Sequence, residues 1–527
     1  MIELTVARIA EIVGGTLSDI SADEAARTVV SGTVEFDSRA IRPGGLFLAL
    51  PGARSDGHDH AAAAIAAGAV VVLAARPVGV PAIVVAPDRS TGADRSGVLE
   101  HDTDGAGAAV LRALAELARA VATDLVAGGL TIVGITGSSG KTSTKDLVAA
   151  VLAPLGEVVA PPGSFNNELG HPWTVLRANR DTKYLVLEMS ARHPGNIAAL
   201  ARIATPAIGV VLNVGTAHLG EFGSRDVIAQ TKSELPQSVP PSGVVILNVD
   251  DPAVAAMASV TAARVVRVGR AAASPEQTLD VWAGPVLLDA SARPRFTLHT
   301  SDASSEVALG VFGDHHVSNA LCAAAVALEC GADVNQIAAA LGAAGPTSRH
   351  RMQVSDRADG VTVIDDAYNA NPDSMRAGLQ ALAWIARGGQ PDAGTVPVRR
   401  SWAVLGEMGE LGADSISEHE DIGRHAVRLD VSRLVVVGSG GSVNAMLLAA
   451  RAERTFRSGG HDGEEGGHSV LSVADADAAL LVLREQLRPG DVVLVKASNA
   501  VGLGALADTL IAEKTLGAGP DDGSLCS

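Results

Sequence analysis

Between residues 130 and 250 the chain alternates short apolar runs with amphipathic stretches. The apolar runs are typical of buried strands, because they are short, rich in β-branched residues and bounded by turn residues. They are LTIVGIT (130–136), KYLVLEMS (183–190), AIGVVLNV (207–214) and GVVILNV (243–249). Strands that alternate with helices in this way predict a parallel α/β sheet.

The same alternation returns after Arg349. Its apolar runs predict strands at VTVIDDAY (361–368), SWAVLG (401–406), RLVVVGS (433–439) and DVVLVKAS (491–498). Its amphipathic runs predict helices over SMRAGLQALAWIA (374–386), EHEDIGRHAVRL (418–429), NAMLLAARAE (444–453) and GALADTLIAEK (504–514). We therefore expect a second α/β unit in the last part of the chain.

The first part of the chain has a different pattern of apolar and polar residues. AAAAIAAGAVVVLAA (61–75) predicts an Ala-rich helix that stops at Gly68 and is followed by a buried strand. The polar tract 87–107 is interpreted as a loop or insertion, and VLRALAELARAVATDL (110–125) as an amphipathic helix. Further along, 273–310 is less regular and suggests antiparallel strands, and a helix is expected after Asn319 up to Gly331.

These patterns divide the 527 residues into three expected domains, 1–127, 128–346 and 347–527. The number agrees with a typical domain size of about 150 residues. Surface insertions are expected at 387–400 and 458–469, and a disordered tail after about residue 515.

Composition excludes several classes of protein. Lys and Arg total 41 against 59 Asp and Glu, and a net charge of -18 makes the chain a poor non-specific partner for nucleic acid or an anionic membrane. The charged amino terminus lacks the apolar core of a signal peptide, and no apolar run reaches the ~20 residues of a spanning helix. The 3 cysteines are too few for a disulfide framework. We expect a cytoplasmic protein.

The stretch TGSSGKT (136–142) carries the strongest chemical signal. It joins an apolar strand to a helix that begins at Lys141, and backbone N–H groups at such a helix start favour bound phosphate. Lys141 would place a charge on the outer phosphates, and Thr142 a hydroxyl on Mg²⁺. The common spacing needs a glycine where this chain has Ile135, so the loop is shorter than in most kinases and small GTPases. The alternative is an ordinary glycine turn with an exposed lysine.

Two polar residues follow neighbouring strands at the same edge of the predicted sheet. Glu188 ends one strand and His218 comes shortly after another, and ligands gather at the carboxyl ends of parallel strands. A carboxylate there suits Mg²⁺, although a lone Glu or His is more often structural. Lys232, in IAQTKSELP, by itself reads as a surface lysine near Glu234.

Six motifs occur in the order found in the Mur ligases, the ATP-dependent amide ligases of peptidoglycan precursor synthesis. They are TGSSGKT, EMSARHPGNI, NVGTAHLGEFGS, GDHHVSNALCAAAVA, SRHRMQV and IDDAYNANPDSM, and the short loop G-x-x-G-K-[ST] is the form of this family. GSFNNELGHPWTVL (163–176), DDAYNANPDSM (365–375) and VLVKASNAVGL (493–503) are most similar to the member that adds D-alanyl-D-alanine.

The resemblance implies an α/β protein of three domains: a small UDP-binding domain, a central P-loop parallel-sheet ATPase domain and a C-terminal Rossmann-like domain. It implies ATP, two Mg²⁺ ions and a carbamylated Lys232, which reverses the reading of that lysine as a surface residue. The implied substrates are UDP-MurNAc-tripeptide and D-Ala-D-Ala, joined through an acyl phosphate by a monomeric enzyme without membrane insertion. The third residue of the peptide, diaminopimelate or lysine, stays open.

The resemblance also gives roles to single residues. Expected to contact ATP are Gly137, Ser138, Ser139, Gly140, Lys141, Thr142, Ser143, Asn319, Arg351, Asp366, Tyr368 and Asn371. Within this set, Asn319 is expected near the adenine, Arg351 at the γ-phosphate and Asp366 at the ribose. Expected in catalysis are Lys141, Glu188, His218 and Lys232, and expected to hold Mg²⁺ are Thr142, Glu188, His218 and Lys232. Expected to contact the UDP-linked substrate are Ser38, Arg39, His58, Asn166, Asn167 and Glu168. Ser190 and Asn196 depart from the family's usual EMG…GDI pattern.

Three other functions fit these motifs less well. A folate polyglutamate or cyanophycin-type ligase of the same fold is disfavoured by the UDP-type first domain and by NANPDSM. A nicotinamide dehydrogenase would use LVVVGSGGSVNA (434–445), but the third glycine position of the fingerprint is Val443. A GTPase switch would need a guanine-reading N-K-x-D motif, which is absent from the sequence.

Overall fold

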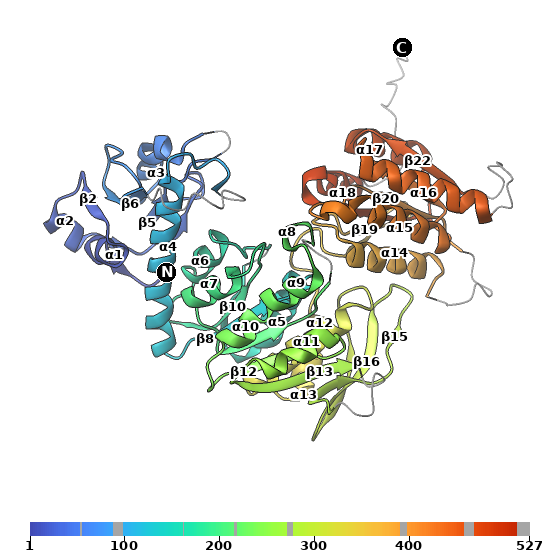
Figure 1. Cartoon of the computed structure of the whole chain (residues 1–527), viewed down its shortest axis with the longest axis horizontal. Coiled ribbons are helices and arrows are strands. Elements are labelled where there is room, and N and C mark those ends of the chain that lie inside the picture. The colour runs from blue at the N-terminus through green and yellow to red at the C-terminus, as the bar shows by residue number, and fades with distance from the viewer. Residues whose placement is uncertain are drawn as a thin grey trace, which may run out of the picture.

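The computed structural model describes residues 1–52, 55–87, 99–161, 163–215, 219–270, 278–389, 398–457 and 468–513. Its strands form three large sheets that follow one another along the chain, and a small antiparallel pair of β1 (Leu4–Thr5) with β3 (Val29–Val30). Figure 1 shows the three corresponding bodies, with the green and yellow central one between the blue and the orange ones. The expected mixed α/β fold is confirmed.

The first sheet has five strands in the order β2 (Thr16–Ser18), β7 (Ala82–Val84), β6 (Ala69–Ala74), β5 (Gly45–Leu48) and β4 (Val34–Glu35). Its helices are α1 (Val6–Val13), α2 (Ala22–Arg27), α3 (Ala61–Ala66) and the 3₁₀ turn η1 (Gly57–His60). The expected helix, glycine stop and strand are confirmed, and Gly68 takes a positive φ of 117° between α3 and β6.

The long helix α4 (Ala106–Ala127) joins the first and second bodies (Figure 1). It packs against α1 on one side and against α6 (Gly170–Val175) and α7 (Asn196–Ile203) on the other, so one hydrophobic core runs through both. The interpretation of 87–107 as a loop was wrong for its last residues, because α4 already begins at Ala106. Residues 88–98 lie outside the described part, but Asp102 is buried and its carboxylate accepts the N–H groups of Gly105 and Ala108 at the start of α4.

The second sheet has ten strands. Their order is β15 (Leu287–Leu288), β16 (Pro294–Thr300), β14 (Val281–Ala283), β13 (Arg264–Arg270), β12 (Val244–Asn248), β11 (Ile208–Val211), β8 (Thr131–Thr136), β10 (Thr182–Glu188) and β9 (Glu157–Val159), with β17 (Ser304–Ala308) paired to β16. The strands from β9 to β14 run parallel and those from β15 to β17 antiparallel to their neighbours. All four predicted strands and the antiparallel region are confirmed.

Helices cover this sheet. They are α5 (Lys141–Leu152), α8 (Leu219–Phe222), α9 (Arg225–Lys232), α10 (Glu234–Ser238), α11 (Pro252–Ala255), α12 (His316–Glu329) and α13 (Val334–Ala343), besides the 3₁₀ turns η3 (Ala153–Leu155) and η4 (Ala256–Ser259). The expected start of α12 after Asn319 was wrong, because the helix begins at His316 and Asn319 lies buried within its first turn.

The third sheet has six strands in the order β18 (Gln353–Asp356), β19 (Thr362–Asp365), β23 (Val492–Lys496), β20 (Ser401–Leu405), β21 (Arg433–Val437) and β22 (Ser469–Val473). Its helices are α14 (Pro372–Ala386), α15 (Ser415–Arg428), α16 (Gly441–Arg457), α17 (Ala476–Gln486) and α18 (Leu503–Ala512), with η5 (Gly412–Asp414) and η6 (Asn499–Val501). The four predicted strands and helices of this region are all present.

Sequence analysis missed three elements of the third body: β18, β22 and α17. The two strands lie at the two edges of the sheet and are only partly buried, so neither has the apolar run of a central strand. Residues 390–397, 458–467 and 514–527, where insertions and a tail were expected, lie outside the described residues. Over the part that is described, no helix has the length and apolar character needed to cross a membrane. The exact domain boundaries stay predictions.

Candidate active site

The phosphate loop follows β8, a central strand of the second sheet. β8 pairs with β10 on one side and β11 on the other, so the carboxyl ends of all three strands meet where the loop begins. α5 starts at Lys141, as predicted, and Gly140 before it has a φ of 82°. A Cβ added at Gly140 would lie 2.7 Å from Oδ1 of Asn319, so this position requires glycine for both its backbone and its neighbour. Asn319 was expected near an adenine; the structure places it against the loop.

An asparagine that sequence analysis missed holds the loop from the next strand. Asn213 follows β11, and its side-chain Oδ1 accepts the N–H of Ser139 (3.0 Å) while its Nδ2 donates to the carbonyl of Ser139 (3.2 Å). Ser138 is buried, and its hydroxyl accepts the N–H of Gly215 (2.9 Å). These contacts fix the turn between β8 and α5. Asn213 is the first residue of the motif NVGTAHLGEFGS, but no local pattern in the sequence shows which residue its side chain contacts.

Lys141 folds back over the loop it follows. Its Nζ donates to the carbonyl of Gly137 (2.6 Å). Burial lowers the pKa of Lys141 to about 8, with the nearby Glu188 carboxylate acting against this and the Arg351 guanidinium adding to it. The lysine is therefore a cation held in a water-poor place, and an anion arriving at the loop gains a strong partner.

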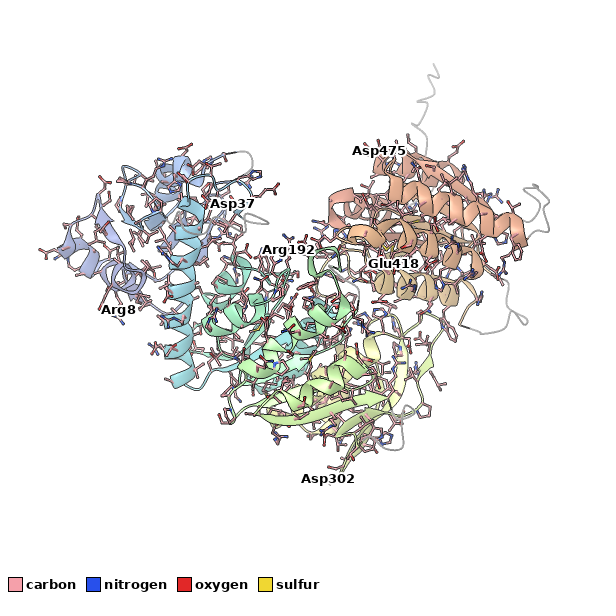
Figure 2. The ribbon with its side chains drawn as sticks, viewed as in Figure 1. Arg8, Asp37, Arg192, Asp302, Glu418 and Asp475 are labelled. Atoms are coloured by element: carbon pink, nitrogen blue, oxygen red, sulfur yellow. The ribbon has the colours of Figure 1, made fainter. Side chains whose placement is uncertain are left out.

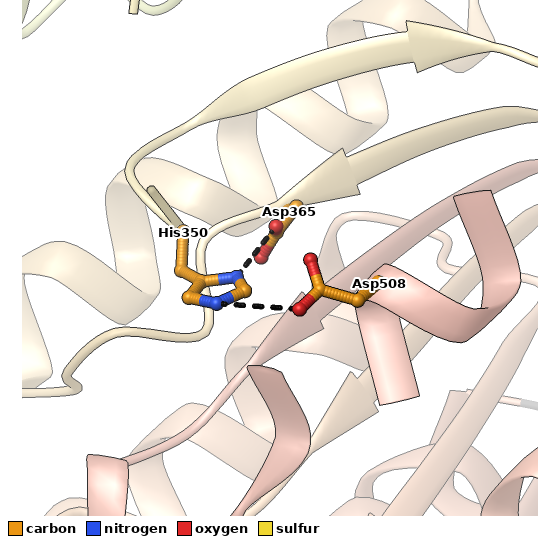
Figure 3. A group of neighbouring side chains, drawn as sticks. All are labelled: His350, Asp365 and Asp508. Atoms are coloured by element: carbon orange, nitrogen blue, oxygen red, sulfur yellow. Dashed lines mark hydrogen bonds and ion pairs between the residues drawn. The ribbon is translucent and has the colours of Figure 1, made fainter. Parts of the chain in front are cut away.

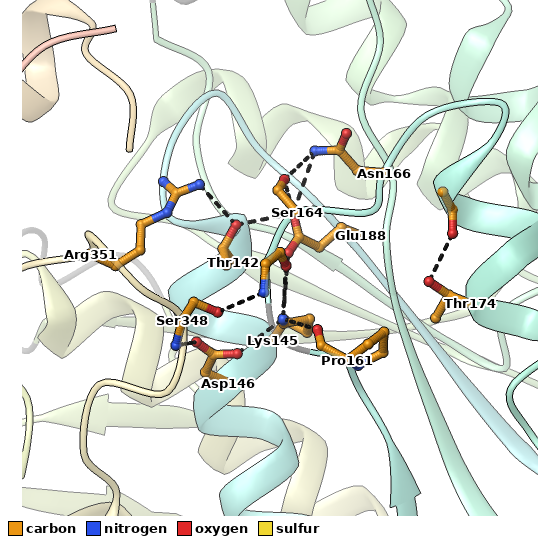
Figure 4. Close-up of polar contacts among 12 residues, drawn as sticks. Thr142, Lys145, Asp146, Pro161, Ser164, Asn166, Thr174, Glu188, Ser348 and Arg351 are labelled. Carbon is orange, nitrogen blue, oxygen red and sulfur yellow. Dashed lines mark hydrogen bonds and ion pairs between the residues drawn. The ribbon is translucent and has the colours of Figure 1, made fainter. Parts of the chain in front are cut away.

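Glu188 ends β10 directly beside the loop and is buried, with only 3% of its surface exposed. Its Oε2 accepts from the hydroxyls of Thr142 (3.2 Å) and Ser164 (3.0 Å), and Nδ2 of Asn166 lies 3.5 Å away (Figure 4). Its Oε1 has no hydrogen-bond partner in the described part of the chain. A buried carboxylate with spare acceptor capacity is the kind of group that holds a hard cation.

The pair of Thr142 and Glu188 fits the expected Mg²⁺. Two neighbouring ligands of an octahedral Mg²⁺ are about 3 Å apart when each bond is about 2.1 Å long. The 3.2 Å between Oγ1 of Thr142 and Oε2 of Glu188 agrees with that spacing. The two residues come from different elements, α5 and β10, and meet without another side chain between these two oxygens.

Lys232 lies at the end of α9 and is 5% exposed, which contradicts its reading as a surface lysine. Burial, with the nearby Lys141 cation, lowers the pKa of Lys232 well below its usual value. Both effects destabilise the ammonium form of Lys232 relative to its neutral amine. His218, the other expected neighbour of a metal, lies outside the described residues.

The third body delivers an arginine to the loop. Nη2 of Arg351 lies 3.2 Å from the hydroxyl of Thr142 (Figure 4), and its guanidinium stacks 4.0 Å above the ring of Tyr368. Its Nε has no partner among the described residues, so donor capacity remains for an anion. Arg351 is thereby held rigidly, over the same threonine that pairs with Glu188.

The other expected ATP contacts of the third body have partners of their own. Asp366 accepts from the buried Lys496 (2.5 Å) and from the N–H of Met352 (3.1 Å). Asn371 caps α14, since its side chain accepts the N–H of Ser374 (2.9 Å). Their contacts to ATP stay predictions. Ser143 lies in the first turn of α5 and is partly exposed.

The expected substrate loop lies next to Glu188. The Asn166 side chain faces Glu188, whereas Oδ1 of Asn167 accepts the N–H of Gly170 at the start of α6, and Glu168 is exposed. The two departures from the family pattern have local partners: Ser190 donates its hydroxyl to the carbonyl of Asn166 (2.9 Å), and Asn196 accepts the N–H groups of residues 192 and 193.

The expected contacts in the first body differ in their exposure. Arg39 is exposed and donates three hydrogen bonds to Asp37, which is marked in Figure 2, while Ser38 is partly exposed. The ring of His58 is buried, with Nδ1 against Asp56 (2.6 Å) and Nε2 accepting the N–H of Ala75 (3.0 Å). Both nitrogens are used, so a polar contact from His58 to substrate would need these bonds to open.

Models of one protein family match all three bodies of the chain. The Mur ligase middle domain matches residues 135–327, the glutamate ligase domain of Mur ligases matches 350–499, and the family's catalytic domain matches 32–120. Each of these ranges contains most of the strands of one sheet.

Known proteins agree with this match. A protein of Mycobacterium tuberculosis named UDP-N-acetylmuramoyl-tripeptide--D-alanyl-D-alanine ligase is 74% identical, over 98% of this chain and 99% of its own. A crystal structure of MurF from Acinetobacter baumannii has a TM-score of 0.77 at 29% identity and covers 97% of this chain and 99% of its own. MurF of Thermotoga maritima in complex with ADP has a TM-score of 0.67 at 26% identity, over 92% and 97%. The chain therefore belongs to the Mur ligase family.

Proposed function

We propose that the chain uses ATP to join D-alanyl-D-alanine to UDP-MurNAc-tripeptide in peptidoglycan precursor synthesis, with ADP and phosphate as the other products. The observation that carries this proposal is the 74% identity, over almost the full length of both chains, to a ligase named for that reaction. The site supports it, because a phosphate loop, a buried carboxylate and an arginine from another body meet at one point.

The chemistry begins with a carboxylate that is a poor electrophile. An oxygen of the tripeptide's terminal carboxylate attacks the γ-phosphorus of ATP, the bond from that phosphorus to the β–γ bridging oxygen breaks, and ADP leaves. Two anions must approach one another, so positive charge is needed where they meet. Lys141 of α5 and Arg351 of the third body would supply it at the phosphate loop.

The second step forms the amide. The uncharged amine of D-Ala-D-Ala attacks the carbonyl carbon of the acyl phosphate, the carbon–oxygen bond to phosphate breaks, and inorganic phosphate leaves with the proton that the amine nitrogen loses. Water would destroy the acyl phosphate, so the site has to be covered. Contacts between the second and third bodies support such a cover: Arg192 of the second body, which is labelled in Figure 2, pairs with Glu410 of the third (3.3 Å), and the N–H of Gly220 donates to the carbonyl of Glu410.

Mg²⁺ belongs to the same proposal. Thr142 and Glu188 would hold one ion, on the fit of their oxygens described above, and His218 and Lys232 are proposed near a second. Mg²⁺ at this place supplies charge neutralisation for the phosphates.

Carbamylation of Lys232 is proposed on physical grounds as well. Only a neutral amine attacks CO₂, and burial lowers the pKa of this lysine well below its usual value. The product is an anion that can hold a cation. Isotope-labelled bicarbonate, followed by carbon NMR of the wild type and of Lys232→Ala, tests the modification: a carbamate signal present in both proteins would contradict it.

A phosphate-release assay tests the main proposal. UDP-MurNAc-tripeptide, D-Ala-D-Ala, ATP and Mg²⁺ are supplied together and then omitted one at a time, and the tripeptide carries diaminopimelate or lysine in parallel runs. Phosphate release should need every component, with UDP-MurNAc-pentapeptide as product. Release that does not depend on the dipeptide would overturn the proposal. The monomeric state and the cytoplasmic location are part of the proposal, and light scattering of the purified chain checks the first.

A further inference from the structure

Lys145 is a buried lysine to which the proposed reaction gives no role. It follows Lys141 by one helical turn, so both side chains leave the same face of α5. A buried ammonium needs oxygen partners. Nζ of Lys145 donates to the carbonyls of Pro161 (2.5 Å) and Gly163 (3.0 Å) and pairs with Oδ1 of Asp146 (3.0 Å), as Figure 4 shows.

The same ammonium faces Glu188. Its Nζ lies 4.0 Å from Oε1 of Glu188, the oxygen without a hydrogen bond in the described part of the chain, while Oε2 points to Thr142. A fixed cation on one side of a carboxylate favours the orientation that directs its other oxygen away from that cation. Lys145 is therefore placed to orient Oε2 of Glu188 towards the phosphate loop.

Lys145 is also one member of a closed ring of four residues. Gly163 accepts from Lys145 and donates its N–H to the hydroxyl of Ser348 (3.2 Å), Ser348 donates its N–H to Oδ2 of Asp146 (3.1 Å), and Asp146 pairs with Lys145. Ser348, 1% exposed, belongs to the segment that links the second and third bodies. The ring thus binds the start of this linker to α5.

The linker is held at its far end by the third body. Nδ1 of His350 lies 2.8 Å from Oδ2 of Asp365 at the end of β19, and its Nε2 is 3.9 Å from Asp508 of α18 (Figure 3). Ser348 is thus fixed to one body and His350 to the other. The Arg349 side chain also pairs with Asp508 (2.8 Å), so a rotation between the two bodies that keeps all these contacts has to occur between Ser348 and Arg349.

Arg351 follows Ser348, a member of the ring, by only three residues. Three residues of extended chain span at most about 11 Å, so a fixed Ser348 limits where the guanidinium of Arg351 can be placed. The hydrogen bond from Arg351 to Thr142 joins residues that are 209 positions apart in sequence. To place Arg351 precisely against Thr142, the chain close to Arg351 has to be fixed to the second body, and the ring fixes it at Ser348.

We propose that Lys145 is a positioning residue for the ligase reaction: it orients Glu188 and, through Asp146 and Ser348, anchors the linker that carries Arg351. The proposal rests on the proposed function for its catalytic part, and the ring itself exists without any ligand. Partners that orient a metal ligand typically change metal affinity or activity by about 10- to 100-fold when removed.

The variant Lys145→Met removes the charge and keeps the length of the side chain. We expect kcat to fall by about 10- to 100-fold and the Mg²⁺ concentration for half-maximal rate to rise, with KM for UDP-MurNAc-tripeptide unchanged. Lys145→Arg, which keeps a cation, should recover part of the rate. Lys183→Met is the matched control, because Lys183 is exposed on the neighbouring strand β10 and should leave all three quantities as in the wild type.

Hydrogen exchange of the ligand-free, metal-free protein gives a second readout. The amides of Gly163 and Ser348 donate within the ring, so peptides that contain them should exchange faster in Lys145→Met and in Ser348→Ala than in the wild type and Lys183→Met. A Lys145→Met protein with wild-type exchange and wild-type Mg²⁺ dependence would overturn the proposal. If that variant does not fold, Ser348→Ala decides: it removes one hydroxyl, and unchanged exchange together with unchanged kcat would overturn it equally. If phosphate release by the wild type does not depend on the dipeptide, the proposed function is wrong. Hydrogen exchange still tests the ring in that case, because it needs no substrate.

Discussion

Gly140→Ala should weaken ATP binding strongly while leaving the rest of the fold intact. Gly140 has a φ of 82°, and an L-residue in the left-handed region costs roughly 1–2 kcal/mol. The new Cβ would also lie 2.7 Å from Oδ1 of Asn319. Asn319 is buried in α12, and its Nδ2 contacts Nδ1 of His316 (3.3 Å), so moving the amide aside costs roughly another 1 kcal/mol as an off-rotamer side chain.

Together these costs amount to about 2–3 kcal/mol, all of it inside the phosphate loop. If the loop relaxes to avoid them, its N–H groups no longer face the phosphates, and the Kd of ATP should rise by about 30- to 150-fold. Titration calorimetry with a non-hydrolysable ATP analogue measures this. The double variant with Asn319→Ala should recover the steric part and keep the backbone part.

The control for this prediction is Gly195→Ala. Gly195 has a similar φ of 91° but nothing within 4 Å of its added Cβ, and it lies at the start of α7 rather than in the loop. Gly195→Ala should lower the free energy of unfolding by the cost of the left-handed backbone and bind the ATP analogue with wild-type affinity. An ATP affinity of Gly140→Ala within threefold of the wild type would refute the reasoning.

Four further outcomes follow from the site. Lys141→Ala should abolish ATP-dependent turnover while UDP-MurNAc-tripeptide still binds in a calorimetric titration; turnover that persists would contradict the role of this lysine. Because burial lowers the pKa of Lys141 to about 8, the cation is lost as pH rises through 8, so the Kd of ATP in the free enzyme should rise from pH 7 to pH 9, and Lys141→Arg should flatten this profile. Arg351→Ala should lower kcat by about 10³-fold or more, as for arginines that face a transferred phosphoryl group, and a loss below tenfold in single-turnover rates would argue against it. Asn213→Ala removes the three hydrogen bonds between its side chain and Ser139 and should raise the Kd of ATP about tenfold; a wild-type affinity would contradict this prediction.

The sequence by itself determined the elements whose signals are local. The run from Ile132 to Lys141 has an apolar strand, a glycine turn and a helix start, each set by residues close together in the chain, and all three appear where expected. Central strands such as β10 and β23 were predictable because both of their faces are buried, which makes them continuously apolar. Edge strands such as β22 have one face in contact with solvent, so their pattern is weak.

Only the tertiary structure decided which distant residues meet. Arg351 and Thr142 are 209 residues apart, and Ser348 and Asp146 are 202 apart. No periodicity encodes such a pair, because it depends on how whole sheets and helices pack rather than on the residues between them. Lys232 shows the same limit: its helical pattern fits a surface lysine, but in the folded chain α9 packs against α7, α8 and α10, and Lys232 is buried with a lowered pKa.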